Sequence, residues 1–196
     1  MRCLFFLLGV ALALAGCGGS GSRFRNVDIT GAGYGSDFVL TDHTGRTRRL
    51  ADFRGKAVVM FFGYTRCPDV CPTTLAELKM VKERLGVEGE RLQVLFVTVD
   101  PERDTQQVLA SYVPAFDPSF LGLRGDASAT AKVAKDFKVY YQKVPGSSPG
   151  SYTMDHTAGS YVFDPQGRLR LFVRHGNAAN LTQDIETLLR ARSLAG

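Results

Sequence analysis

The stretch KAVVMFFGYTRCPDVCPTTLAELKMVKERL, residues 56–85, decides the fold of this chain. Its first part, Lys56 to Gly63, is a continuous apolar run of strand length with β-branched and aromatic residues, which is typical of a strand buried on both faces. Its last part, Thr73 to Leu85, spaces apolar residues along one side of a helix. Cys67 and Cys71 lie between the two. The stretch therefore predicts a central strand that leads through a cysteine-bearing turn into a helix.

The sequence after this stretch continues to alternate strand and helix patterns. Residues 92–99 form a second apolar run of strand length, and residues 104–113 and 126–137 read as helices separated by the short segment 120–124. Such alternation predicts an α/β sheet with parallel crossovers.

The C-terminal part has a different pattern. Two short apolar segments, residues 160–163 and 169–173, flank the turn sequence Asp-Pro-Gln-Gly at 164–167, which predicts an antiparallel hairpin. A last amphipathic helix is expected over about residues 179–191. A parallel βαβ start followed by a β-hairpin and a helix is the element order of the thioredoxin fold.

A further hairpin precedes the central strand. Residues 38–41 and 46–50 read as short strands around the turn His43-Thr44-Gly45. We therefore predict one domain over residues 37–193, in the α/β class, with a thioredoxin-like fold. Its central mixed β-sheet is flanked by helices and carries an N-terminal β-hairpin extension.

The first residues, MRCLFFLLGVALALAGC, predict a secretory signal. The apolar run at 4–15 is shorter than the roughly 20 residues that a membrane-spanning helix needs. Leu14 to Cys17 resembles a bacterial lipobox, so residues 1–16 are expected to be a lipoprotein signal peptide and Cys17 to be lipidated. The alternative is an ordinary signal peptide with a chance cysteine beside its cleavage site.

Residues 17–36 are then the lipid anchor and a flexible lead-in, because a stretch of glycine and serine follows Cys17 directly. This organisation predicts a protein tethered to the extracytoplasmic face of the bacterial cell membrane, on the periplasmic side. Which membrane carries it is left open.

The charge of the chain favours no nucleic-acid partner. Lys and Arg number 24 against 19 Asp and Glu, and the surplus is spread along the sequence without a basic run. No long apolar stripe on a surface helix calls for a second copy, so a monomer is expected. Of the 4 cysteines, Cys3 falls in the signal and Cys17 in the anchor. The predicted domain therefore holds a single pair of thiols.

The position of this pair at a strand-to-helix junction predicts that both sulfurs lie at a helix N-terminus. The unsatisfied N–H groups and the helix dipole there favour thiolates and lower thiol pKa values. Two thiolates suit a reversible disulfide, a structural metal or a soft transition metal. Cys67 and Cys71 are separated by three residues, whereas thioredoxin-type redox enzymes use two, and structural zinc normally takes four protein ligands. Copper fits the remaining option.

A third ligand to copper would come from one of the 3 histidines. His43 lies in the first hairpin turn, His156 precedes a predicted strand, and His175 precedes the last helix. Histidine is the commonest metal ligand but has many other roles, and the spacing alone does not choose among the three.

At this point several segments resemble the SCO/SenC family of copper chaperones. Phe62 to Thr74, with its CPDVC core, looks like the family's first signature, Val97 to Thr105 like its second, and Tyr152 to Thr157 like the segment with its ligand histidine. Asp28 to Gly31 and Leu50 to Lys56 are also similar to family segments. The resemblance covers nearly all of the chain after the predicted signal.

The resemblance implies that Cys67, Cys71 and His156 bind one copper ion per chain, as Cu(I) or Cu(II). It also suggests Asp155 as a group just outside the ligands that orients or charges the site, although a carboxylate that caps a turn is an equal interpretation. Asp100 and Asp104 could support the site from a strand end. We favour Asp104 as a helix N-cap.

Family membership would make the protein a metallochaperone. It would deliver copper to, or mature, the binuclear copper centre of a haem-copper respiratory oxidase, and its partners would be the copper-binding oxidase subunit and other periplasmic copper carriers or thiol reductants. The alternative is an enzyme, a thiol-disulfide oxidoreductase whose redox pair Cys67 and Cys71 reduces cysteines of that subunit. The Thr157-Ala158 pair stands where thioredoxin-like reductases have a cis-proline, which favours copper. A peroxide-reducing relative is a third interpretation, against which the paired cysteine argues.

Overall fold

The computed structural model describes residues 24–177 and 180–193, and its centre is an eight-stranded mixed sheet. The strand order is β1-β10-β9-β4-β5-β6-β2-β3. The predicted central strand is β4 (Ala57–Gly63), which pairs in parallel with β5 (Leu92–Thr98), and every residue of both strands is buried. β5 in turn pairs in parallel with β6 (Leu121–Arg124). The two long apolar runs of the sequence therefore form the middle of the sheet, as predicted.

The predicted C-terminal hairpin lies on the other side of β4. β9 (Gly159–Phe163) pairs antiparallel with β4, and β10 (Leu169–Arg174) pairs antiparallel with β9. In the turn between them, Asp164 accepts hydrogen bonds from the backbone N–H groups of Gln166 and Arg168, both 3.0 Å long.

The N-terminal hairpin, β2 (Val39–Asp42) and β3 (Thr47–Arg49), extends the opposite edge of the sheet, because β2 pairs antiparallel with β6. Its turn repeats the chemistry of the C-terminal one. Asp42 accepts the backbone N–H groups of Thr44 at 2.8 Å and Arg46 at 3.0 Å. Glycines at positive φ complete both turns, Gly45 at 89° and Gly167 at 70°.

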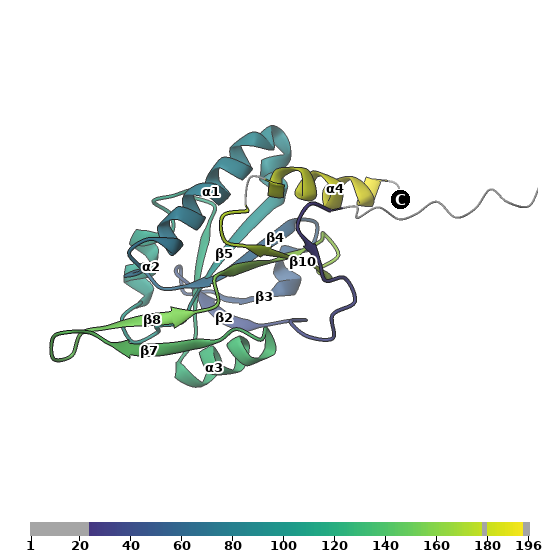
Figure 1. Cartoon of the computed structure of the whole chain (residues 1–196). Helices are drawn as coiled ribbons and strands as arrows, with labels where there is room; N and C mark the ends of the chain where they lie inside the picture. The colour runs from purple at the N-terminus through teal and green to yellow at the C-terminus, as the bar shows by residue number, and fades with distance from the viewer. Residues whose placement is uncertain (1–23, 178–179, 194–196) are drawn as a thin grey trace, which may run out of the picture.

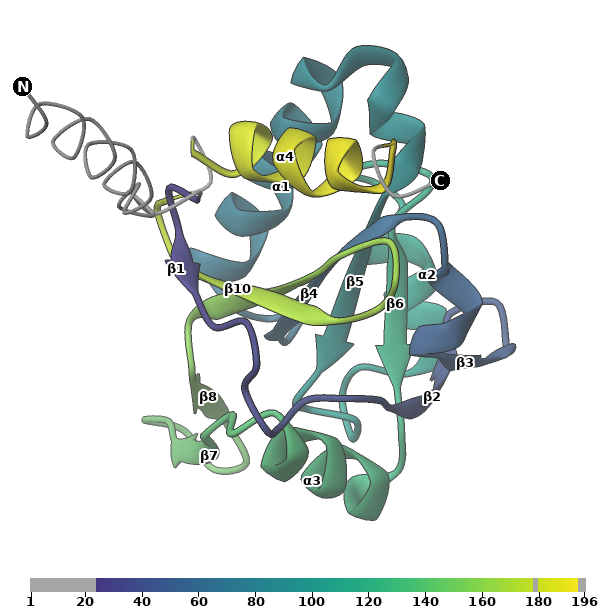
Figure 2. The ribbon, with the colours of Figure 1, turned by 90° about the vertical axis from the view of Figure 1, so that its right-hand side faces the viewer.

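Helices cover both faces of the sheet. α1 (Val70–Arg84) and α4 (Leu181–Ser193) lie side by side on one face, while α3 (Ala127–Asp136) lies on the opposite face (Figures 1 and 2). α2 (Gln106–Tyr112) packs against β6. Two short 3₁₀ helices precede the two central strands: η1 (Leu50–Phe53) lies before β4 and η2 (Gly86–Arg91) lies before β5. The predicted α/β class, with a mixed sheet flanked by helices, is confirmed.

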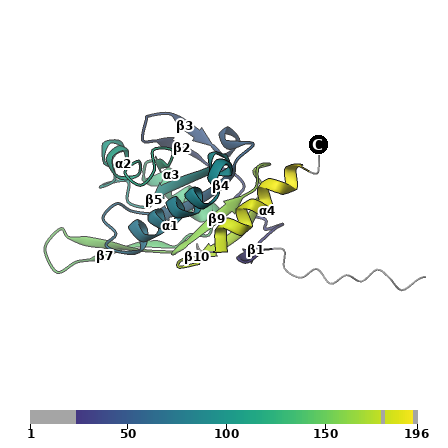
Figure 3. The same ribbon diagram turned by 90° about the horizontal axis from the view of Figure 1, so that it is seen from above.

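Strands β1, β7 and β8 were not predicted from the sequence. β1 (Val27–Asp28), within the expected lead-in, pairs antiparallel with β10 at the edge of the sheet. β7 (Tyr141–Pro145) and β8 (Tyr152–His156) form a separate two-stranded sheet. This β7–β8 hairpin projects from the body of the molecule in Figures 1 and 3, and residues 146–151 form its tip.

The predicted signal peptide at 1–16 and the lipidation site Cys17 lie outside the described residues. Within the described ranges, no helix is both long enough and apolar enough to cross a membrane.

The segment that contains β1 is held to α4 by one buried carboxylate. Asp184, 1% exposed, accepts the backbone N–H of Arg25 at 2.7 Å and both the backbone N–H and the side-chain amide of Asn26 at 2.9 Å. The neighbouring Gln183 makes only an exposed hydrogen bond, to the Arg25 guanidinium at 3.1 Å.

We predict that Asp184→Ala lowers the free energy of unfolding by about 2–3 kcal/mol, because it leaves donors beside α4 without an acceptor. Urea denaturation of the full chain measures the change. The control Gln183→Ala is expected to stay within about 0.5 kcal/mol of the unsubstituted protein. Equal unfolding midpoints for the two variants would contradict this role of Asp184.

Candidate metal centre

The cysteine pair lies at the junction of β4 and α1. Cys67 belongs to the loop after β4 and is half-buried, whereas Cys71 lies in the first turn of α1 and is fully buried. The backbone N–H of Cys71 points at the sulfur of Cys67, with 3.4 Å between the nitrogen and Sγ. Both cysteines are free thiols. The sequence is therefore right that the pair sits at a helix N-terminus.

A glycine at the end of β4 leaves room for the buried sulfur. A Cβ atom on Gly63 would come within 2.8 Å of Cys71 Sγ and 2.9 Å of the Phe96 ring. Such contacts are too close for real Cβ atoms, so any larger residue at this position would displace either the sulfur or the ring. The absence of a side chain here is what allows α1 to start directly against the sheet.

His156 is the histidine that meets the cysteines. Its Nε2 lies 3.7 Å from Cys71 Sγ, and the donor atoms of Cys67, Cys71 and His156 all lie within 4.8 Å of one another. The Nδ1 of the ring is 3.1 Å from the carbonyl oxygen of Thr157. A carbonyl only accepts, so Nδ1 carries the proton and donates it, which leaves the lone pair of Nε2 facing the sulfurs.

His156 reaches this position from a strand. It is the last residue of β8 and pairs in register with Tyr141 of β7. Its ring packs edge-on against two aromatic rings, Tyr64 at 5.9 Å and Phe61 at 6.3 Å between centroids. The imidazole is therefore held by packing as well as by its hydrogen bond.

The pKa shifts of the site show which forms the donors take at neutral pH. Burial raises the pKa of the Cys71 thiol strongly, and the nearby Cys67 and Asp104 raise it further. The expectation that the helix N-terminus lowers both thiol pKa values is therefore wrong for Cys71, because desolvation outweighs the helix dipole. Burial also lowers the pKa of His156, although the Thr157 carbonyl and the charge of Asp155 oppose this. Cys71 and His156 are both neutral at pH 7.

The donor set fits a soft metal ion. Among the described residues, this is the group of three or more His, Cys, Asp or Glu side chains that could hold a metal. Two sulfurs and one imidazole nitrogen suit copper, and within the same residues no fourth ligand completes a structural zinc site. A metal ion would take the place of the proton on Cys71, so binding should release protons.

The other two histidines make structural hydrogen bonds. Nδ1 of His43 accepts the backbone N–H of Gly122 at 3.1 Å, which fixes the first hairpin turn to β6. Nδ1 of His175 lies 3.2 Å from the hydroxyl oxygen of Thr74, and this hydroxyl itself donates to the Val70 carbonyl at 2.8 Å. His175 is therefore the donor in its contact with Thr74.

The residues predicted around the site have mixed outcomes. Asp155 is exposed on β8 and contributes its charge, so the interpretation as a turn-capping loop carboxylate is wrong. Phe62 and Met154 are core residues, at 1% and 6% exposure. Tyr64 is buried too.

The interpretation of Asp104 as a helix N-cap is also wrong. Thr105 caps α2, through a hydrogen bond from the Val108 N–H to its side chain. Asp104 is instead fully buried and accepts three hydrogen bonds: the Thr65 N–H at 3.0 Å and the hydroxyls of Thr65 and Thr98, both at 2.6 Å. Because Thr65 lies two residues before Cys67, Asp104 supports the cysteine loop.

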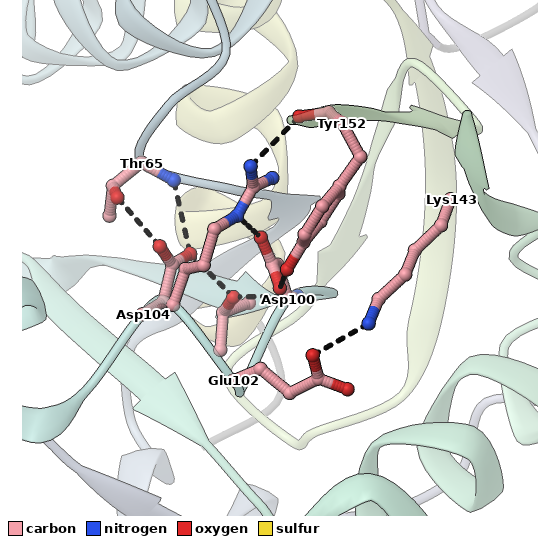
Figure 4. A network of polar contacts seen from close by, with 8 residues as sticks. Thr65, Asp100, Glu102, Asp104, Lys143 and Tyr152 are labelled. Atoms are coloured by element: carbon pink, nitrogen blue, oxygen red, sulfur yellow. Dashed lines mark hydrogen bonds and ion pairs between the residues drawn. The ribbon is translucent and has the colours of Figure 1, made fainter. Parts of the chain in front are cut away.

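Sequence reasoning missed Arg103 and Tyr152. Arg103 forms an ion pair with Asp100 and donates to the Tyr152 carbonyl at 2.8 Å. The Tyr152 hydroxyl donates to Asp100 at 2.9 Å (Figure 4). The charged run at 100–104 was the only feature of the sequence that pointed to these residues. It does not indicate which distant segment the charged side chains contact.

Known proteins with similar sequences agree with a copper-binding site of this kind. The family model described as SCO1/SenC matches residues 27–190. The mitochondrial protein SCO2 homolog of Bos taurus is 41% identical over 161 residues, which are 81% of this chain and 59% of that protein. The mitochondrial protein SCO1 homolog of Homo sapiens is 35% identical over 159 residues, 80% of this chain and 53% of that protein. The chain thus spans less than two thirds of the length of these relatives.

Solved structures are similar over most of their length. Bradyrhizobium japonicum ScoI with copper bound shares 40% identity at a TM-score of 0.70, covering 81% of this chain and 98% of that one. The solution structure of apo Sco1 from Thermus thermophilus shares 42% identity at a TM-score of 0.73, covering 85% and 96%. These neighbours confirm the predicted thioredoxin-like fold.

The unequal burial of the two thiols predicts unequal reactivity. In the reduced, metal-free full chain, iodoacetamide should modify Cys67 at least about ten times faster than Cys71 at pH 7, because alkylation needs an accessible thiolate. Peptide mapping by mass spectrometry separates the two positions. The rate at Cys71 should rise only above the ordinary thiol range, since its pKa is raised. In urea the two rates should converge, and equal rates in the folded protein would contradict the site described here.

Proposed function

The chain belongs to the SCO1/SenC family, and from this premise we propose that it binds copper through Cys67, Cys71 and His156 and passes it on. The receiver would be the copper-binding subunit of a haem-copper respiratory oxidase, whose binuclear copper centre the protein delivers copper to or matures. We propose further that it acts as a monomer on the extracytoplasmic face of the bacterial membrane, anchored through Cys17.

The observation that carries this proposal is the convergence of three soft or borderline donors within 4.8 Å of one another. Thiolate sulfur binds Cu(I) well, and an added imidazole nitrogen also suits Cu(II). The tautomer of His156 also supports copper binding. Its Nδ1 is hydrogen-bonded to the Thr157 carbonyl, and its Nε2 faces the sulfurs. The similar structure of Bradyrhizobium japonicum ScoI has copper bound, which agrees with a copper cargo.

Exposure of the ligands suggests how copper would leave. Cys71 is fully buried, whereas Cys67 is half-buried in the loop ahead of α1. A receiving protein could therefore reach the metal past Cys67 while Cys71 and His156 still hold it. A site with only three protein ligands leaves room for a ligand from the receiver, which exchange between two proteins requires.

Thiol-disulfide exchange is the second candidate function. Two observations favour it: both cysteines are free, and their sulfurs are close enough to join after a small movement. In that case the pair would give two electrons and two protons to a disulfide of the oxidase subunit, and would itself become a disulfide. His156 has no part in this exchange, so the histidine separates the two functions.

We predict that His156→Ala weakens Cu(II) binding to the reduced full chain by more than about 100-fold, because loss of a direct ligand should exceed the 10- to 100-fold cost of losing an outer hydrogen-bond partner. Titration followed through the thiolate-to-copper charge-transfer absorption measures this. Oxidation to the Cys67–Cys71 disulfide should proceed as before.

His175→Ala is the matched control. This histidine forms a hydrogen bond with Thr74 of α1 and is not one of the three donors. Its Cu(II) affinity should stay within about twofold of the unsubstituted protein. If His156→Ala bound copper as tightly as His175→Ala does, His156 would not be a ligand.

A second experiment distinguishes a carrier from a reductase. Copper-loaded full chain is mixed with the reduced, copper-free binding domain of the oxidase subunit, and separately the reduced, copper-free chain is mixed with the oxidised domain. A carrier is expected to transfer metal in the first mixture at a rate that His156→Ala changes. Thiols appearing on the subunit in the second mixture, at a rate that His156→Ala leaves unchanged, would favour the reductase.

A further inference from the structure

We propose that Arg103, which is not a ligand, is a positioning residue that holds His156 against the cysteine pair by fixing the β7–β8 hairpin to the Asp100–Asp104 loop. The inference rests on the proposed function and deepens it, because it assigns the alignment of the site to a side chain that touches no donor atom. It starts from how the hairpin is attached.

The β7–β8 hairpin pairs with no strand of the main sheet in the described part of the chain. The Thr157 N–H donates to the Tyr140 carbonyl at 2.9 Å, which closes the base of the hairpin, and the next residue, Ala158, accepts the His175 N–H at 3.4 Å. Within the described residues, no sheet pairing orients the hairpin itself, so side-chain contacts between the hairpin and the rest of the domain help to set the position of His156.

Arg103 makes the central contact of this kind. Its Nε donates to Asp100 and its Nη1 donates to the Tyr152 carbonyl at 2.8 Å. Its guanidinium also stacks on the Tyr152 ring, 3.5 Å from the centroid. A planar guanidinium can make all three interactions at once, whereas an ammonium group cannot.

The same group reaches toward the histidine through Tyr64. The Arg103 guanidinium lies 5.8 Å from the centre of the Tyr64 ring, and that ring lies edge-on to His156 at 5.9 Å. Arg103 therefore contacts the first residue of β8 through hydrogen bonding and stacking, and approaches the last residue of β8 through one intervening ring.

Burial decides which attachment matters most. Lys143 on β7 also reaches the loop, donating to Glu102 at 2.6 Å, but these two side chains are 46% and 66% exposed. Arg103 and Asp100 are 16% and 1% exposed. Exposed ion pairs contribute little, whereas breaking a buried, hydrogen-bonded pair leaves an uncompensated charge. The Arg103–Asp100 pair should therefore dominate.

The Asp100–Asp104 loop also holds the other half of the site. Asp104 accepts the backbone N–H and the hydroxyl of Thr65, two residues before Cys67 (Figure 4). One short loop thus holds the cysteine loop through Asp104 and the histidine hairpin through Arg103. Loss of the Arg103 contacts should release only the histidine half.

A double-mutant cycle on the full chain tests the inference. Arg103→Met should weaken Cu(II) binding about 10- to 100-fold when His156 is present, the range for residues that orient a ligand. In the His156→Ala background, the same substitution should change Cu(II) affinity less than about twofold, because the residue through which it acts is gone. The nitrogen hyperfine coupling of bound Cu(II) should also weaken in Arg103→Met alone.

Arg48→Met is the matched control for stability. Arg48 pairs with the buried Asp42 at 2.7 Å, with exposures of 23% and 0% close to those of Arg103 and Asp100, but on the remote β2–β3 hairpin. It should lower the unfolding midpoint while leaving Cu(II) affinity and the nitrogen signal unchanged. If Arg103→Met proves unfolded, Arg103→Lys, which keeps the charge but not the fork of donors, takes its place in the cycle.

The outcomes separate the inference from the proposed function. No copper binding by the unsubstituted chain would overturn the function itself. Normal binding with an equal loss from Arg103→Met in both backgrounds, or with no loss in either, would overturn the positioning role of Arg103 alone.

Discussion

The packing of Cys71 against the end of β4 is the constraint on which the rest of the site depends. A Cβ atom on Gly63 would lie only 2.8 Å from Cys71 Sγ. Because Gly63 has no side chain, the sulfur can pack against the end of β4 and α1 can begin immediately after the loop. This contact fixes one donor inside the protein. Cys67, held by the N–H of Cys71, and His156, at the end of β8, are then arranged around that fixed sulfur.

Burial gives the site a thermodynamic character different from that of a surface thiol pair. A helix N-terminus favours thiolates, but desolvation of Cys71 is the larger effect and raises its pKa. In the metal-free site, the Cys71 thiol therefore keeps a proton that a metal ion must displace. The imidazole of His156 is neutral, so its Nε2 can bind a metal ion without losing a proton. Such a site binds a soft cation more readily at higher pH, because binding competes with protons.

Much of the fold follows from the sequence because its strongest signals are local. The runs that form β4 and β5 are continuous and buried along their whole length. The cysteine pair lies at the N-terminus of α1, as predicted, although the helix begins three residues earlier than expected and includes Cys71. β1 was missed because two residues in a glycine-rich segment carry no period, and they become a strand only by pairing with β10. The β7–β8 hairpin was missed for a similar reason, since most of its residues are exposed and it is held by a loop about 40 to 50 positions earlier in the chain.

The candidate site shows the same division. Family resemblance suggested Cys67, Cys71 and His156, which the fold brings together, whereas the spacing of the histidines could not choose among them. The supporting residues could not be read from local patterns. Asp104 resembled a helix cap because it precedes α2, and only the fold brings Thr65 and Thr98 to its carboxylate. Long-range polar contacts of this kind leave no periodic trace in a sequence.

The central claim is that these two sulfurs and one imidazole nitrogen bind a single copper ion. X-ray absorption spectroscopy at the copper edge, on the reduced full chain loaded with one equivalent of copper, tests it most directly. The account predicts a first coordination shell with two sulfur scatterers and one imidazole nitrogen, which reverts to sulfur alone in His156→Ala. A shell without sulfur, or one with an imidazole that persists in His156→Ala, would contradict it.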